Sequence, residues 1–192
     1  MKNIDTNVKN GKKKILISSF GWRRTWGMLL SKIRVGMDLQ MIADKYEGKD
    51  SLSYKVIGCA MRVYKTLGPG LLESIYEQAL MIELDEAGID AECQVPFKAL
   101  YNGVELEGYF RIDIIVENEL VLELKSVKEL DPVHFKQLRS YLRLLNRPLG
   151  YLINFNVSDF SVGKGWDRIY NDWYDEDATP SVRMMKKHDA NI

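Results

Sequence analysis

The spacing of apolar residues changes along the chain, and this change restricts the fold more than any other feature. Between residues 51 and 87 apolar side chains recur every three or four positions, which predicts two amphipathic helices. The first helix ends at residues 68–70, Gly-Pro-Gly, because proline cannot continue a helix. Between residues 93 and 126 the spacing becomes two, which is typical of strands. Both periods in one segment predict an α/β domain.

Turn residues divide the segment with a spacing of two into three strands. A first strand over 93–101 ends at Asn102-Gly103, a strong tight-turn dipeptide. The chain returns over 104–116, turns at 117–119 and runs back over 120–126. Asp131-Pro132 then predicts the start of a helix that reaches about residue 146, and a buried strand follows over 149–155. The predicted order is ααβββαβ, with a mixed central sheet flanked by helices.

Charge and composition suggest three parts of the chain. Residues 1–36 contain nine basic residues and one acidic residue, whereas 37–192 contain 18 basic and 26 acidic residues, so net charges of +8 and −8 cancel. We interpret 1–50 as a basic extension, either disordered or an over-extended gene start, 51–174 as the domain, and 175–192 as a C-terminal tail. No apolar run reaches the roughly 18–20 residues of a membrane span. Two cysteines are too few for a disulfide framework, which favours a cytoplasmic location.

A candidate reactive centre lies on two neighbouring strands. Glu123 and Lys125 are two residues apart, so their side chains project from the same face of a strand. The turn at 117–119 folds Asp113 back beside Glu123. Two carboxylates this close need a neutralising charge, and oxygen ligands favour Mg²⁺ or Mn²⁺ over zinc. The alternative interpretation is a solvated ion pair, because an acid and a lysine at this spacing arise often by chance.

The helix that follows carries a second group of polar residues. Gln137 and Tyr141 are four residues apart and share one helical face, and His134 joins them near the helix N-terminus. Phosphates bind readily at helix N-termini, so these residues are candidates for substrate binding or for support of the site. The alternative is that His134 caps the helix and that Gln137 and Tyr141 form an ordinary polar edge.

Five motifs in order resemble those of a known family over residues 51–157. The run Gly70–Glu77 resembles the motif that names the GxxExxY protein family, a branch of the PD-(D/E)xK nuclease superfamily. The other four matching runs are residues 111–116 (Arg-Ile-Asp-Ile-Ile-Val), 122–126 (Leu-Glu-Leu-Lys-Ser), 132–137 (Pro-Val-His-Phe-Lys-Gln) with Tyr141, and 150–156 (Gly-Tyr-Leu-Ile-Asn-Phe-Asn). Each motif is weak alone, but five in sequence are specific.

The resemblance implies a fold of the restriction-endonuclease type and a role for each motif residue. Asp113 and Glu123 would be metal ligands, Lys125 the catalytic lysine, and Glu73 a further acid near the metal. Gln137 and Tyr141 match a QxxxY pattern of exonuclease-like branches, where it supports the site or contacts DNA.

The main hypothesis is therefore a cytoplasmic Mg²⁺-dependent nuclease that hydrolyses DNA phosphodiesters, in repair or defence. A second hypothesis is a non-catalytic nucleic-acid-binding module that uses His134, Gln137 and the basic extension. A third is a protein-interaction subunit whose acidic surface binds a partner. A homodimer stays open under each hypothesis, because nothing in the sequence identifies a dimer face.

Overall fold

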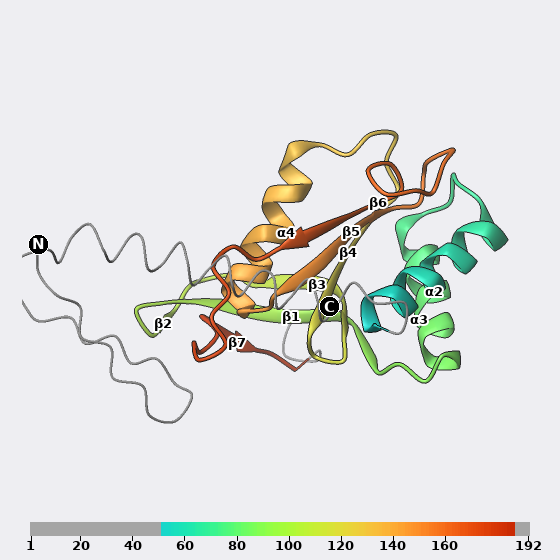
Figure 1. The fold of residues 1–192 in the computed structure, drawn as a ribbon. Helices are drawn as coiled ribbons and strands as arrows, with labels where there is room; N and C mark the ends of the chain where they lie inside the picture. The colour runs from blue at the N-terminus through green and yellow to red at the C-terminus, as the bar shows by residue number, and fades with distance from the viewer. Residues whose placement is uncertain (1–50, 187–192) are drawn as a thin grey trace, which may run out of the picture. The chain divides into compact units, whose positions relative to one another are not determined.

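The computed structural model describes residues 51–186 as an α/β domain (Figure 1). The predicted extension, residues 1–50, lies outside the described residues. The helices are α2 (Leu52–Leu67), α3 (Glu73–Glu86) and α4 (Pro132–Leu145). The strands are β1 (Ala91–Tyr101), β2 (Val104–Glu105), β3 (Phe110–Val116), β4 (Leu120–Lys125), β5 (Leu149–Asn154), β6 (Trp166–Tyr170) and β7 (Val182–Met184). Within residues 51–186 no helix is long and apolar enough to cross a membrane.

The strands form one mixed sheet in the order β2-β1-β3-β4-β5-β6, with β7 beside β1. Only β4 and β5 are parallel among these described strands, and α4 connects them; the other pairs are antiparallel. The predicted α/β fold with a mixed sheet and flanking helices is confirmed. The strand predicted over 104–116 is interrupted, because the chain between β2 and β3 turns at Gly108, whose φ is +84°.

Both faces of the sheet are covered by helices. Alternate residues of β4, such as Leu122, pack with α2 and α3 in one apolar core. The intervening residue Val121 packs with α4 in a second core. Glu123 has the same parity as Val121, so it lies on the face that α4 covers. The carboxylate is therefore placed between a sheet and a helix rather than on an open surface.

Residues 166–184 add two strands that the predicted order lacked. β6 pairs with β5 from Ile153↔Trp166 to Leu149↔Tyr170. β7 lies in the segment predicted as a tail and pairs with Phe97–Ala99 of β1. The edge of an outer strand offers unpaired backbone groups, and β7 satisfies them. Three residues are too few to show a periodic pattern, so this strand could not be predicted from the sequence.

Close packing of α4 on the sheet depends on Gly150, and this gives a first prediction. A Cβ atom at Gly150 would lie 2.9 Å from Leu138 Cδ1 of α4 and 2.9 Å from the Val121 carbonyl oxygen. We expect Gly150→Ala to lower the free energy of unfolding by about 2 kcal/mol, because α4 must move outward. Gly58→Ala is the matched control, since its Cβ meets nothing closer than 3.8 Å and alanine favours the helix. Urea denaturation measures the stability of both variants. A Gly150→Ala variant as stable as wild type would show that close packing at Gly150 does not set the position of α4.

Candidate functional site

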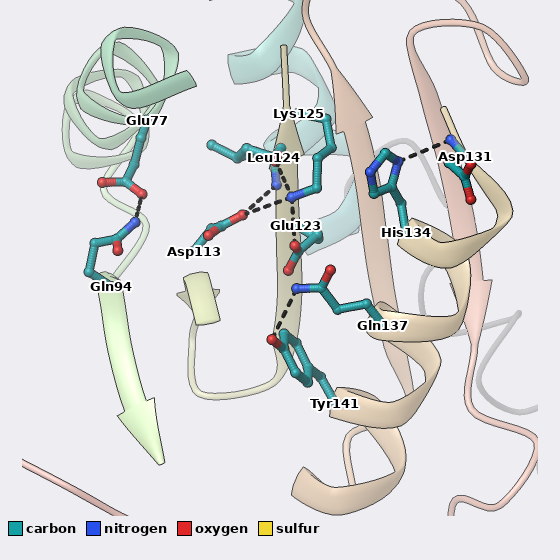
Figure 2. A network of polar contacts seen from close by, with 10 residues as sticks. All are labelled: Glu77, Gln94, Asp113, Glu123, Leu124, Lys125, Asp131, His134, Gln137 and Tyr141. Carbon is teal, nitrogen blue, oxygen red and sulfur yellow. Dashed lines mark hydrogen bonds and ion pairs between the residues drawn. The ribbon is translucent and has the colours of Figure 1, made fainter. Parts of the chain in front are cut away.

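Strands β3 and β4 separate at the level of Asp113 and Glu123. Their ladder ends at the pair Ile114↔Leu122, so Asp113 and Glu123 would form the next pair. Instead, the Asp113 carboxylate accepts a hydrogen bond from the backbone N–H of Leu124, with Oδ2 at 2.8 Å from the nitrogen. Figure 2 shows this carboxylate directed from β3 toward β4. A side chain therefore takes the place of the missing backbone acceptor and is fixed in direction.

Lys125 completes a compact group of charges with the two acids. Its ammonium donates to Glu123 Oε1 at 2.6 Å and to the Leu124 carbonyl oxygen at 2.7 Å. The same nitrogen lies 3.9 Å from Asp113 Oδ2. The exposed fractions of the side chains are 13% for Lys125, 13% for Asp113 and 2% for Glu123. The structure thus brings together the three residues predicted as the reactive centre, here named the carboxylate–lysine cluster.

Burial and mutual repulsion shift the proton affinities of this cluster. Burial, followed by the charge of Asp113, raises the pKa of Glu123 to about 7, although Lys125 opposes the shift. Burial also raises the pKa of Asp113, against the Leu124 N–H and the charge of Lys125. For Lys125, burial lowers the pKa, but attraction by Glu123 and Asp113 outweighs it and the pKa is raised. One ammonium therefore does not fully compensate two buried carboxylates, and Glu123 titrates near neutral pH.

Glu73 approaches the cluster from the first turn of α3. Its pKa is raised, first by burial and then by the charges of Asp113 and Glu77, while Lys125 and the Ser126 N–H act in the opposite direction. Glu73 is therefore within electrostatic reach of Asp113 and Lys125. This predicted metal ligand lies on the helix that covers the opposite face from α4, and within residues 51–186 it does not complete a three-ligand group.

Tyr76 ties the turn between α2 and α3 to the end of β4. The buried Tyr76 hydroxyl donates to the Gly68 carbonyl oxygen at 2.7 Å and accepts from the Leu71 N–H at 3.1 Å. The Ser126 hydroxyl, one residue beyond Lys125, donates to the Leu71 carbonyl oxygen at 2.6 Å. Tyr76 is thus a core residue whose hydroxyl positions the turn, and its four-residue spacing from the buried Leu80 was the available signal in the sequence.

Gln137 and Tyr141 of α4 lie beside the cluster (Figure 2). Gln137 Nε2 donates to the Tyr141 hydroxyl at 3.0 Å. The Tyr141 ring packs edge-on against Phe97, with ring centroids 5.5 Å apart. Burial raises the pKa of Tyr141, and the charges of Glu123 and Asp113 add to that shift. This tyrosine therefore stays protonated at neutral pH and available as a hydroxyl donor.

His134 has a local partner at the start of α4. Its Nδ1 accepts a hydrogen bond from the Asp131 N–H at 3.1 Å, while the Asp131 carboxylate accepts from the Val133 N–H at 2.8 Å. This is a capping box, in which histidine replaces the usual glutamate. An accepting Nδ1 means that the uncharged ring carries its proton on Nε2. A role of His134 in substrate binding stays a prediction.

The acids of the cluster fit a hard divalent cation, but not as a complete ligand set. Within residues 51–186 no three His, Cys, Asp or Glu side chains group closely enough to hold a metal ion. Glu123 Oε2 is buried and accepts no hydrogen bond from any described residue. A buried carboxylate oxygen without a donor, next to a second carboxylate, is a site where a cation relieves repulsion. Asp113 and Glu123 are the residues that would hold Mg²⁺ or Mn²⁺ there.

Comparisons with known proteins agree with this geometry at the level of a superfamily. A search of curated proteins found no match. A solved structure titled "Crystal structure of SSO0001" is 20% identical to this chain. The match covers 74% of this chain and 78% of the solved one, and its TM-score is 0.40, a likeness too distant to bear on function. A family model described as the PD-(D/E)XK nuclease superfamily matches residues 50–169, which include the carboxylate–lysine cluster and more than half of the chain. The chain therefore belongs to the PD-(D/E)XK nuclease superfamily.

Proposed function

We propose that this protein is a metal-dependent nuclease that hydrolyses phosphodiester bonds in DNA. The observation that carries the proposal is the carboxylate–lysine cluster, in which two buried acids converge on one ammonium. A structural ion pair needs one acid for one base. The second carboxylate, and the buried Glu123 Oε2 without a donor, are instead what a site for a divalent cation requires.

Each residue of the cluster has a role in this reaction. Asp113 and Glu123 hold Mg²⁺ or Mn²⁺, and Glu73 supplies a further acid from α3. When bound, the metal supplies a water of lowered pKa and neutralises charge on the phosphate. The Lys125 ammonium orients the attacking water and stabilises the charge that develops on the phosphate oxygens. Gln137 and Tyr141 support the site from α4 or donate hydrogen bonds to the DNA backbone.

We place the chain in the GxxExxY branch of the superfamily, and contacts of the motif residues support this. Gly70 has a φ of +99°, a conformation that glycine adopts without steric cost. Glu73 faces the charges of the cluster, and Tyr76 fixes the turn that contacts Ser126. The three residues that define the motif thus act on one end of β4, close to Lys125.

The leading alternative is a non-catalytic nucleic-acid-binding module. In its favour, the Lys125 ammonium already lies 2.6 Å from Glu123 Oε1, and the described residues hold no three-ligand group. An ion pair of this kind satisfies the cluster without a metal. The net charge of −8 over residues 37–192 counts against this alternative as well, because it weakens nonspecific attraction to phosphates. A cytoplasmic location and action on DNA rather than RNA are part of the proposal.

The test is cleavage of single- and double-stranded DNA and RNA by the full chain, with Mg²⁺, with Mn²⁺ and with a chelator. Lys125→Ala is the inactive variant, and Lys65→Ala, at an exposed position of α2, is the matched control. We expect cleavage of DNA by the wild type and the control only in the presence of metal, and none by Lys125→Ala. Equal cleavage by Lys125→Ala would reject the assigned centre.

A different result favours the other hypotheses. If the wild type does not cut but binds DNA without metal, with an affinity that falls steeply as salt rises, the chain is a binding module. If it neither cuts nor binds DNA and copurifies with another protein, the interaction-subunit hypothesis leads. Sedimentation of the same preparation determines whether the chain forms a homodimer.

A further inference from the structure

Side chains of a strand alternate between the two faces of the sheet, and in β1 and β3 this alternation shifts by one residue at the same position. We call this shift the change of phase. In β1, Cys93 packs with the core under α2 and α3, whereas Val95, two residues later, packs with the core under α4. In β3, Ile114 likewise packs with the core under α2 and α3, whereas Ile112 packs with the core under α4. A regular strand directs residues two apart to the same face. The ladder pairs Cys93 with Ile114 and Val95 with Ile112, so the change falls where Gln94 lies opposite Asp113.

Gln94 has the backbone conformation that produces this change. Its φ is +55°, in the left-handed region, although it lies inside a strand and carries a side chain. The other non-glycine residues with positive φ among the described residues lie in turns or at the end of α4, and they are Asn102, Glu117, Asn118 and Asn146. A left-handed residue inside a strand is unfavourable and is found where neighbouring structure holds it. Such residues concentrate at functional sites.

A side-chain contact holds Gln94 in place. Its Nε2 donates to the Glu77 carboxylate on α3, and Figure 2 shows this pair next to Asp113. Glu77 lies one helical turn after Glu73, so the helix that brings Glu73 to the cluster also anchors Gln94. The contact links the covering helix to the strand that lies beside Asp113.

The change of phase determines where the Asp113 carboxylate points. In β3, Ile112 packs under α4, whereas Ile114 packs under α2 and α3 and Ile115 packs under α4, so Asp113 lies at the boundary between the two patterns. There its Oδ2 reaches across to the Leu124 N–H at 2.8 Å and remains 3.9 Å from the Lys125 ammonium. From this position the charge of Asp113 raises the pKa of Glu73 on α3 and of Tyr141 on α4.

We infer that Gln94 is a positioning residue, whose left-handed backbone, anchored by Glu77, directs the Asp113 carboxylate onto the end of β4. Its importance for cleavage rests on the proposed function, but its effect on Asp113 does not. No family motif in the sequence includes Gln94, and Glu77 comes after the three residues that define the first motif, Gly70, Glu73 and Tyr76. Their contribution is to hold a cluster ligand at the boundary between the two covered faces of the sheet.

Hydrogen exchange of the Leu124 amide tests this inference without any need for activity. Gln94→Gly retains the left-handed backbone, whereas Gln94→Val opposes it, because β-branched residues resist positive φ. We expect the Leu124 amide to exchange at least roughly tenfold faster in Gln94→Val and within about threefold of wild type in Gln94→Gly. Asp113→Ala gives the exchange rate of the Leu124 amide without its carboxylate acceptor. Amides of the β5–β6 ladder should keep their wild-type rates in every variant.

Two results would overturn the inference. One is wild-type protection of Leu124 in Gln94→Val. The other is equal acceleration in the glycine and valine variants, which would assign the effect to the lost side chain alone. If Gln94→Val does not fold, Gln94→Ala replaces it, with an expected rate between those of glycine and Asp113→Ala. For an active nuclease, the valine variant should also lose about tenfold in kcat with a smaller change in KM; normal exchange with altered kcat would again reject the inference.

Discussion

Glu123→Gln is expected to reduce metal-dependent cleavage by roughly 10³-fold or more while making the folded protein more stable at pH 8. Glutamine retains the shape of the side chain and an oxygen for the Lys125 ammonium, now 2.6 Å from Glu123 Oε1. It removes a charge that is nearly inaccessible to water and that lies beside a second carboxylate. The proposed metal ligand is thus unfavourable for the metal-free fold, a common trade between activity and stability.

The direction of the pH dependence follows from the raised pKa of Glu123. In the folded state the pKa is about 7, against an ordinary value of 4.5, so the folded protein binds this proton more tightly than the unfolded chain. The associated stability is fully present below pH 4.5 and is lost as the pH rises through about 7. The loss amounts to about 3 kcal/mol at most. Glutamine has no proton to lose, so the variant should gain about 2 kcal/mol over wild type at pH 8 and little at pH 4.5.

Urea denaturation at pH 5 and pH 8, in the presence of a chelator, measures this difference. Glu86→Gln, at an exposed position of α3, is the matched control and should follow the wild type at both pH values. Stability of the wild type that does not fall between pH 5 and pH 8 would contradict the prediction. So would a Glu123→Gln variant that is less stable than wild type at pH 8, because Lys125 would then compensate the carboxylate fully.

Local patterns were sufficient to predict the helices, the central strands and the convergence of the cluster. The two-residue spacing of Glu123 and Lys125 determines that both leave the same face of β4. The short turn at 117–119 brings Asp113 back to the level of Glu123, one position beyond the last ladder pair, Ile114↔Leu122. Asn102-Gly103 and the Asp131 cap also lie where they were predicted. Each of these features depends on residues close in sequence, so one amino-acid sequence is enough to predict them.

Features that depend on distant contacts were not predictable in this way. The left-handed conformation of Gln94 is held by α3, and the sequence around it continues the regular alternation of a strand. The depth of Glu123 arises because α4 packs closely over β5, which depends on Gly150. The hydroxyl of Tyr76 finds its partners in a turn that the apolar pattern does not describe. In each case tertiary packing, rather than local preference, decides the geometry of the site.

Lys125→Met is expected to eliminate cleavage as well, but with the opposite effect on stability from Glu123→Gln. Methionine fills a similar volume and removes the ammonium that hydrogen-bonds Glu123 and lies 3.9 Å from Asp113. At pH 8 two buried carboxylates then remain without a counter-charge. Breaking a buried ion pair in this way costs about 3 kcal/mol. At pH 5 the carboxyls accept protons more readily, so the variant should lose about 1 kcal/mol or less.

The steeper fall of stability with pH is the distinguishing result, and urea denaturation over pH 5 to 8 measures it. Lys65→Met on the exposed surface of α2 should show no such slope. The double variant Glu123→Gln/Lys125→Met leaves one buried acid without a partner instead of two. It should therefore be more stable than Lys125→Met at pH 8, by about 2 kcal/mol. If the double variant is instead the less stable of the two, the lysine serves mainly as apolar packing and the cluster is not held by charge. Recovery in the double variant would show that the ammonium of Lys125 is what allows both acids of this site to remain buried.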